Sequence, residues 1–304
     1  LKDTTVTLMK IGEEGTPLIE DYLYKAIPAK GKLGFDGRVV TASEGRSFME
    51  RLADKQVSLA TSEDLVDLIW EDRPAMSAEP AFLLDEKYAG KSAVQKLDEL
   101  RKAMKENGCT VHVITTLDDI AWLFNIRGND VECNPVVLSY AVITMEKAHF
   151  FVNPACLNEE IREKLSADGV EIHPYGEIIS FVKSLSADET VLLDPQKVNY
   201  EIDSSIQGKK VEKANPTQLA KAIKNPVELK NIRNAHIKDG VAFTKFMYWL
   251  KTNVGKIPMT EMSAAEYLLA RRAEQDGFIE PSFETISAYK ANAAMMHYSA
   301  TEES

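Results

Sequence analysis

The sequence has few cysteines, and their number and spacing do not fit a disulfide framework. Its three cysteines, Cys109, Cys133 and Cys156, are odd in number and more than twenty residues apart. A secreted framework needs an even set, and a zinc site needs a closely spaced pair. We therefore expect three reduced thiols, buried or at strand edges, in a cytoplasmic protein.

Basic residues and long apolar runs are also scarce. The 304 residues include 36 Lys and Arg against 47 Asp and Glu, a formal net charge of −11. A nucleic-acid groove or an anionic membrane surface needs a positive field, so neither partner is expected. Apolar stretches such as Val136–Thr144 have the length of a strand, well below the roughly 20 residues that span a bilayer. Residues 1–10 have no apolar segment typical of a signal peptide.

Common catalytic motifs are missing as well. The sequence contains no H-E-x-x-H, G-x-S-x-G, Walker or dinucleotide-binding glycine pattern. Zinc hydrolases of the H-E-x-x-H type, serine hydrolases and nucleotide-binding folds are therefore not indicated by motif.

The residues that are present predict alternating short helices and strands, which is typical of α/β layering. In the first block, Glu44–Ala53 has a helical apolar period and Gln56–Ala60 resembles a strand. The stretch Leu65–Trp70 predicts a short amphipathic helix or a turn. Two prolines within Arg73–Pro80 then mark a boundary near residue 78.

The second block repeats this class of structure. Ser92 is a suitable N-cap for a helix that Gly108 ends. Val136–Thr144 and Ala148–Val152 predict a hairpin of buried strands, and Val170–Pro174 predicts one more strand. The block ends near residue 220.

The third block opens with a long predicted helix, Pro226–Leu250, and Thr260 caps a second helix that runs to Gln275. Phe283–Tyr289 and Met295–Tyr298 resemble two strands around a turn. Two helices and one hairpin cannot close a core, so this domain is expected to be incomplete.

The histidines are the first candidates for chemistry. For four of the five, a structural role is favoured over metal binding, because three lie in or beside predicted strands and one lies on a long helix. These four are His112, His149, His173 and His236. His297 differs, because it follows the small residues Ala291–Ala294, which let a backbone approach closely. The residues alone still slightly favour a structural role for it.

Six segments, taken in order, resemble one family. Together they look like the large, three-domain Xaa-Pro aminopeptidases (aminopeptidase P) of the creatinase/prolidase "pita-bread" metallopeptidases. The likeness extends over essentially the whole chain. The segments are Leu65–Pro74, Thr116–Gly128, Asn134–Ala141, Lys221–Asn225, Ala235–Asp239, and Ser282–Ile286 continuing to His297–Tyr298.

The resemblance implies a fold and a division of the chain. The expected class is α/β (α+β), with two creatinase-like α/β domains ahead of a pita-bread catalytic domain. Residues 1–78 would be the remainder of the first creatinase-like domain, and residues 79–220 the second. Residues 221–304 would be the beginning of the pita-bread domain.

The resemblance also implies an activity. The family removes the N-terminal residue from short peptides with proline in second position, and it uses two metal ions, usually manganese. His297 falls on the family's first active-site histidine. That residue is catalytic and substrate-binding: it contacts the scissile peptide and helps to stabilise the intermediate, and it does not bind metal. Homologous enzymes are often homodimers, so a cytoplasmic homodimer is expected.

Two departures from the family pattern bear on activity. The family's five metal ligands lie downstream of the position of His297, and this sequence ends seven residues after it. Lys290-Ala291-Asn292 also stands where the family usually has Gly-Pro-Asn, which brings the local turn into question. We therefore expect an internal fragment without metal ligands that is inactive by itself.

Two other interpretations stay open at this level. A non-enzymatic dimerisation or binding module could use the apolar surface of Trp122–Phe124, although an ordinary core role is favoured for that stretch. A creatine-type amidinohydrolase on the same scaffold fits the Trp-containing segments less well.

Overall fold

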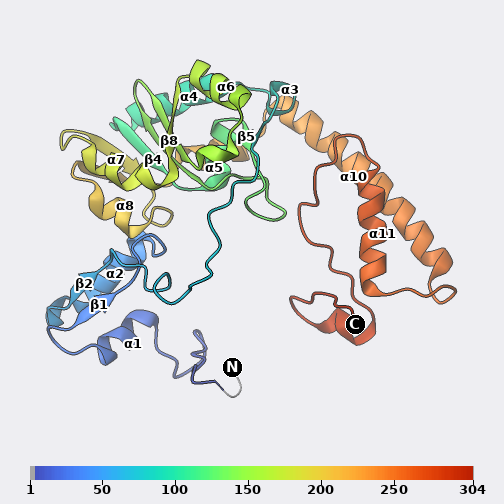
Figure 1. Cartoon of the computed structure of the whole chain (residues 1–304), viewed down its shortest axis with the longest axis horizontal. Helices are drawn as coiled ribbons and strands as arrows, with labels where there is room; N and C mark the ends of the chain where they lie inside the picture. Colours follow the sequence, from blue (N-terminus) through green and yellow to red (C-terminus); the bar gives the residue numbers. More distant parts are fainter. Residues whose placement is uncertain (1–3, 304) are drawn as a thin grey trace.

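The computed structural model describes residues 4–303, which form three parts along the chain (Figure 1). A small N-terminal part is followed by a six-stranded sheet with helices on both faces. Two long helices and an irregular C-terminal segment make up the third part. Across residues 4–303, no helix is both long enough and apolar enough to cross a membrane.

The N-terminal part is built on a parallel pair of short strands. Strand β1 (Lys32–Gly34) pairs with β2 (Ser58–Ala60), and helices α1 (Ile19–Ala26) and α2 (Ala42–Leu52) accompany them. Thr41 and Glu44 form a capping box at the start of α2, which satisfies two of the free N–H groups of the first turn. The residues of β1 are exposed or half-buried, because this small sheet has only two strands.

The central sheet is mixed, with the strand order β10-β9-β4-β6-β7-β8. Strand β6 is antiparallel to both β4 and β7, whereas the remaining neighbours are parallel. The strands are β4 (Val111–Ile114), β6 (Ser139–Thr144), β7 (Ala148–Val152), β8 (Val170–Pro174), β9 (Thr190–Leu193) and β10 (Lys209–Glu212). A separate antiparallel pair joins β3 (Phe82–Leu83) to β5 (Ile126–Arg127).

Helices cover both faces of this sheet, and each face has its own apolar cluster. One cluster includes residues of α4 (Ala93–Glu106), α5 (Leu117–Leu123) and α6 (Glu159–Ala167). The other includes residues of α2, α7 (Ile178–Ser184) and α8 (Tyr200–Ser205). Since both faces are covered, β4 and β7 are buried along their whole length. The predicted α/β (α+β) class is confirmed.

Backbone and ionic contacts attach the N-terminal part to the sheet. The amides of Ala42 and Ser43 donate to the carbonyls of Val198 and Pro195 at 2.9 Å each. Arg46 pairs with the carboxylate of Asp203, which is buried beneath it, at 2.5 Å. A buried charge is tolerated only when it is paired, so this contact fixes α2 against α8.

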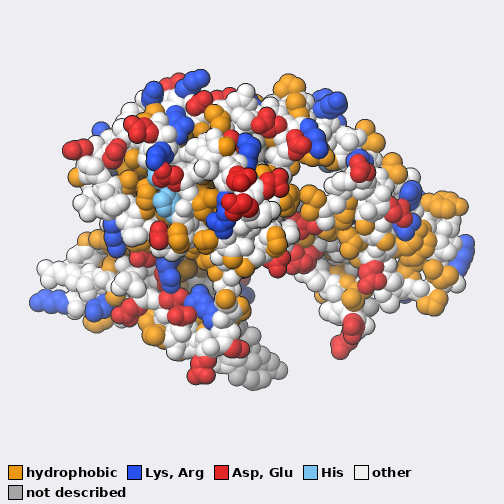
Figure 2. All heavy atoms as spheres, turned by 45° about the horizontal axis from the view of Figure 1, so that its top comes forward, with side chains coloured by type: hydrophobic (Ala, Val, Ile, Leu, Met, Phe, Trp, Pro, Cys, Tyr) orange, Lys and Arg blue, Asp and Glu red, His pale blue; other side chains and the backbone are white. Residues whose placement is uncertain are grey.

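The third part leaves the sheet along a single long helix. Helix α10 (Pro226–Asn253) starts at Asn225, whose side chain caps it and also donates to the carbonyl of Ala89 at the end of α3 (Glu86–Ala89). Helix α11 (Glu261–Ala273) returns along α10, where Trp249 and Tyr267 stack at 4.0 Å between ring centroids. Figure 2 shows apolar side chains gathered over this helical part.

Two exposed segments, residues 65–70 and 283–298, contain neither a regular α-helix nor a strand. The residues Leu65–Trp70 form turns, and their apolar side chains are exposed; Ile69 reaches 81%. The strands expected at Phe283–Tyr289 and Met295–Tyr298 are wrong: these stretches are irregular and flank a short 3-10 helix, Lys290–Ala294. Neither stretch has a neighbouring strand to pair with, so a strand-like pattern alone does not produce one. A short helix, α9 (Pro216–Ala222), precedes α10.

Candidate functional site

His297 lies in a loop, residues 289–298, that packs against the start of α11. Its side chain is exposed, and its backbone has φ +53°, in the left-handed region. That conformation costs a non-glycine residue about 1–2 kcal/mol. The surrounding contacts must therefore hold this loop in place against a local cost.

Those contacts converge on one buried carboxylate. Glu261, the first residue of α11, is 7% exposed and accepts hydrogen bonds from the backbone amide of Tyr289 and the hydroxyl of Tyr298. The amide nitrogen of Asn292 donates to the same carboxylate at 3.1 Å. We call these four residues the Glu261 network. A carboxylate at a helix N-terminus is also stabilised by the free amides and the dipole of that helix.

The network positions His297 through its neighbour. Tyr298 is bound to Glu261 and also accepts from Asn292 at 3.0 Å, so the backbone on the C-terminal side of His297 is fixed. The imidazole itself stays accessible to solvent. Such an arrangement presents one group that can donate or accept a hydrogen bond, on a loop that is tied to a helix.

Lys290 shows why the departure from the family's Gly-Pro-Asn matters. It has φ +52°, a conformation that glycine adopts without a steric penalty. The backbone therefore keeps a turn suited to glycine although the side chain is lysine. Asn292, the third residue of this stretch, is the one that binds Glu261.

No role was predicted from the sequence for Glu261, Asn292 or Tyr298. The available signal was the glutamate directly after the Thr260 cap, because a first-turn carboxylate is usually solvent-exposed and this one is followed by an apolar helix face. The loop that covers it lies about thirty residues further along the chain, so its burial was not visible in local sequence.

The other histidines lie elsewhere. His112 on β4 is fully buried, and its Nδ1 lies 2.9 Å from the carbonyl oxygen of Leu192. Burial lowers the pKa of His112 to about 4, and the contact with the Leu192 carbonyl opposes this shift only in part. His236 is exposed on α10, on a solvated face as expected.

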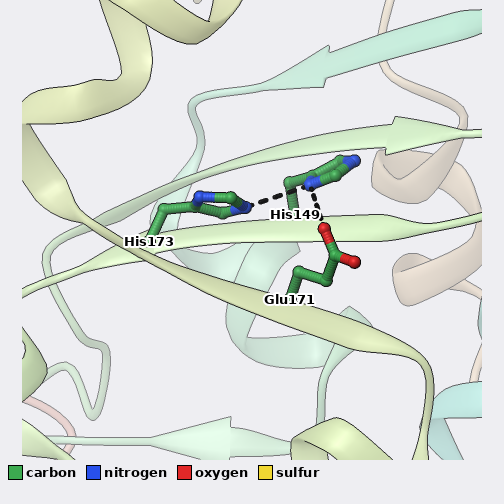
Figure 3. A group of neighbouring side chains, drawn as sticks. All are labelled: His149, Glu171 and His173. Carbon is green, nitrogen blue, oxygen red and sulfur yellow. Dashed lines mark hydrogen bonds and ion pairs between the residues drawn. The ribbon is translucent and has the colours of Figure 1, made fainter.

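His149 and His173 come together with Glu171 on β7 and β8 (Figure 3). We call these three side chains the β7–β8 cluster. His149 Nδ1 lies 3.1 Å from His173 Nε2 and 3.4 Å from a carboxylate oxygen of Glu171. Burial lowers the pKa of His149, and the neighbouring His173 adds to this effect. Each of these histidines was predicted to have a structural role by itself, and their convergence on adjacent strands was not predicted.

The aspartate pair Asp118-Asp119 has a structural environment. Asp119 is buried at the start of α5 and accepts a hydrogen bond from the Thr116 hydroxyl at 2.5 Å, while Lys221 from α9 forms ion pairs with both carboxylates.

The residues Trp122, Leu123 and Phe124 are buried. This stretch therefore belongs to the core, the role that the sequence favoured, and it offers no surface for dimerisation.

The three cysteines are free thiols in separate segments of the chain. Cys109 and Cys156 are buried, and burial raises the pKa of both thiols. Neither is suited to act as a nucleophile near neutral pH, because the thiolate is the reactive form.

Comparison with protein-family models divides the chain near the start of α10. Residues 72–228 match the "Creatinase/Prolidase N-terminal domain", and residues 230–304 match "Metallopeptidase family M24". The chain belongs to the creatinase/prolidase family. The match to the second model includes both the His297 loop and Glu261.

Curated relatives point to the same subgroup of this family. The chain is 40% identical to the "Probable Xaa-Pro aminopeptidase P" of Sordaria macrospora, over 96% of this chain and 50% of that protein. It is 33% identical to "Xaa-Pro aminopeptidase 1" of Dictyostelium discoideum, over 97% of this chain and 49% of that protein. The resemblance to the aminopeptidase P group is therefore confirmed. The chain spans about half the length of the curated relatives it matches.

One solved structure of this family matches the present chain over almost its whole length. The X-prolyl aminopeptidase of Caenorhabditis elegans, described as a cytosolic enzyme with a di-nuclear active site, aligns with a TM-score of 0.91 at 33% identity. The alignment covers 98% of this chain and 50% of the other. The expected architecture, creatinase-like α/β structure ahead of the start of a metallopeptidase domain, is confirmed.

The described residues do not assemble a two-metal centre at His297. Within residues 4–303, the structure groups three or more His, Cys, Asp or Glu ligands only in the β7–β8 cluster, which does not include His297. A two-metal hydrolase site needs several carboxylates and a histidine around one pair of ions. This part of the chain therefore contributes an imidazole and its supporting loop, without a ligand set around them.

Proposed function

We propose that the protein to which this sequence belongs is a metal-dependent aminopeptidase that removes the N-terminal residue from short peptides with proline in second position. The observation that carries the proposal is the match of residues 230–304 to a metallopeptidase family, directly after a creatinase-like region. The names of the relatives support the same substrate class.

In this proposal His297 is the catalytic and substrate-binding residue of the chain. Its exposed imidazole hydrogen-bonds to the scissile peptide and to the oxyanion that forms there, which favours the transition state over the ground state. The Glu261 network holds the loop so that the imidazole is positioned before substrate arrives. Pre-organised donors of this kind contribute about a hundredfold to a thousandfold to kcat.

Two bound divalent cations, manganese in our proposal, would lower the pKa of the water that attacks the scissile carbonyl in the whole protein. Their ligands are proposed to lie outside residues 4–303, since these residues bring no ligand set to His297. The 304-residue chain is accordingly proposed to be inactive by itself.

The proposed division of the chain follows the sequence boundaries. Residues 1–78 and 79–220 act as two creatinase-like domains, and residues 221–304 begin the catalytic domain. The start of α10 at Pro226 supports the last boundary, because the helix leaves the central sheet there.

We also propose a cytoplasmic homodimer. The turn Leu65–Trp70 supports a protein interface, because its apolar side chains are 45–81% exposed. The same observation favours the second candidate, a non-enzymatic dimerisation module of creatinase-like domains.

The test begins with the intact mass of the protein made from its native gene, followed by an assay of that protein and of the 304-residue chain. With Mn²⁺ present, the native protein should release the first residue from a tripeptide with proline second, and much more slowly from its alanine counterpart. The 304-residue chain should release none.

Two variants of the native protein separate the roles. His297→Ala should lower kcat about a hundredfold or more, whereas His236→Ala should not change it. A native protein that is dimeric but inactive on both peptides would refute the enzyme proposal and leave the dimerisation module. Activity of the isolated chain would refute its proposed inactivity.

A further inference from the structure

The β7–β8 cluster lies on one face of the central sheet because of strand register. Strands β7 and β8 are parallel, with His149 opposite Glu171 and Phe151 opposite His173. Side chains two residues apart on a strand point to the same face, so all four side chains share it. The convergence in Figure 3 is thus a consequence of backbone pairing.

Two separations between the ligand atoms are close to those around a tetrahedral metal ion. Zinc binds imidazole nitrogen and carboxylate oxygen at about 2.0–2.2 Å, which places two tetrahedral ligands about 3.3–3.5 Å apart. His149 Nδ1 is 3.1 Å from His173 Nε2 and 3.4 Å from the Glu171 oxygen. All three ligand atoms lie within 4.8 Å of one another.

Neighbouring side chains restrict how far the two imidazoles can move. His173 stacks on Phe151 at 4.8 Å between ring centroids and with 20° between the planes. Phe181 of α7 packs against His149 at 4.5 Å and against His173 at 5.6 Å. Metal ligands held by packing lose little freedom on binding, so this packing favours a defined site.

Glu171 is oriented by a partner on the other side. Lys147 forms an ion pair with one carboxylate oxygen of Glu171, while the second oxygen faces His149. The lysine fixes the carboxylate, yet its positive charge also lowers the affinity for a cation. The Glu171 side chain is 43% exposed, so water can complete the coordination.

We propose that His149, His173 and Glu171 bind one divalent cation of the zinc type, with water as the fourth ligand. Two imidazoles and one carboxylate suit Zn²⁺ and do not suit Ca²⁺ or Mg²⁺, which prefer oxygen ligands. The ion links β8, the edge strand of the sheet, to β7. This site is separate from the proposed peptidase centre, because its residues lie on the creatinase-like part of the chain.

The test uses the 304-residue chain and Zn²⁺ itself. Equilibrium dialysis against Zn²⁺, with the bound metal counted by mass spectrometry, should show one more zinc per chain in the wild type than in Glu171→Gln or His173→Gln. Each of these substitutions should weaken binding at this site at least about tenfold. His236→Gln, on the exposed face of α10, is the matched control and should bind as the wild type does.

A further variant should raise the affinity for Zn²⁺, a result that misfolding would not produce. Lys147→Met keeps all three ligands and removes the competing cation, so it should bind Zn²⁺ more tightly than the wild type. Co²⁺ should give a visible tetrahedral absorption band in the wild type and in Lys147→Met. If all five proteins bind zinc equally, or if none binds it, the proposed site is wrong and the three side chains form only a histidine pair with an ion pair. Either result would leave the peptidase proposal unaffected.

Discussion

Lowering the pH should destabilise the central sheet through His112, and the effect can be calculated. His112 is fully buried on β4, and its Nδ1 lies 2.9 Å from the carbonyl oxygen of Leu192. Its Nε2 has no hydrogen-bond partner among the described residues. A neutral ring with hydrogen on Nδ1 suits this environment, whereas protonation would place a buried N–H at Nε2 without an acceptor.

The sign and size follow from the pKa. Burial lowers the pKa of His112 to about 4 in the folded chain, from 6.5 when unfolded. Between these values the unfolded chain binds a proton that the folded chain does not, so the free energy of unfolding falls as pH falls. From pH 7 to pH 5 the expected loss from this residue is about 2 kcal/mol.

Urea denaturation of the wild type and of His112→Asn at pH 7 and pH 5 measures this loss. Asparagine can still donate to Leu192 but does not titrate, so the variant should lose about 2 kcal/mol less than the wild type over this range. His236→Asn, at an exposed position, is the control and should follow the wild type. Equal losses in the wild type and His112→Asn would show that His112 is not held neutral in the fold.

Three further predictions concern stability. Glu261→Ala removes the common acceptor of the His297 loop, including the Tyr298 hydroxyl, and should cost about 1–3 kcal/mol in urea denaturation, with faster amide exchange in residues 289–298; unchanged exchange would contradict the network. Lys96→Met leaves the Asn125 side chain and a backbone carbonyl without the buried ammonium and should cost about 1–3 kcal/mol at pH 7. Because burial lowers the Lys96 pKa to about 8, from 10.5 when unfolded, the unfolded chain holds the extra proton between these values, so wild-type stability should rise with pH there and the variant should lack this rise. Lys290→Gly removes the steric penalty of a left-handed backbone and should raise the melting temperature of the chain or leave it unchanged. A lower melting temperature would show that the lysine side chain stabilises the turn.

Elements with strong local signals were predictable from sequence. The helix after Ser92 has its capping box, and Gly108 adopts the left-handed conformation expected after a helix end. The hairpin of β6 and β7 and the long helix α10 also lie where the apolar pattern placed them. Their signals come from residues within a few positions of one another, and such information is fully present in local sequence.

Contacts between distant segments were not predictable in the same way. The C-terminal strands failed because a strand needs a partner, and residues 283–298 instead fold onto Glu261. The short elements α8 and β10 were missed, since four to six polar and apolar residues carry little periodic signal. The β7–β8 cluster depends on the parallel register of two strands, which no single segment reveals.

The strand order of the central sheet has a consequence for synthesis of the chain. Strand β4 lies between β6 and β9, and its Val111 pairs with Val191, eighty residues later in sequence. At about 5–20 residues per second, a ribosome needs roughly 4–16 s to make that intervening stretch. During these seconds the edge of β4 that will pair with β9 has no partner strand. An unpaired apolar strand edge favours misassembly with other chains. Chaperone contact is expected to concentrate in this interval, before β9 emerges and pairs with the waiting edge.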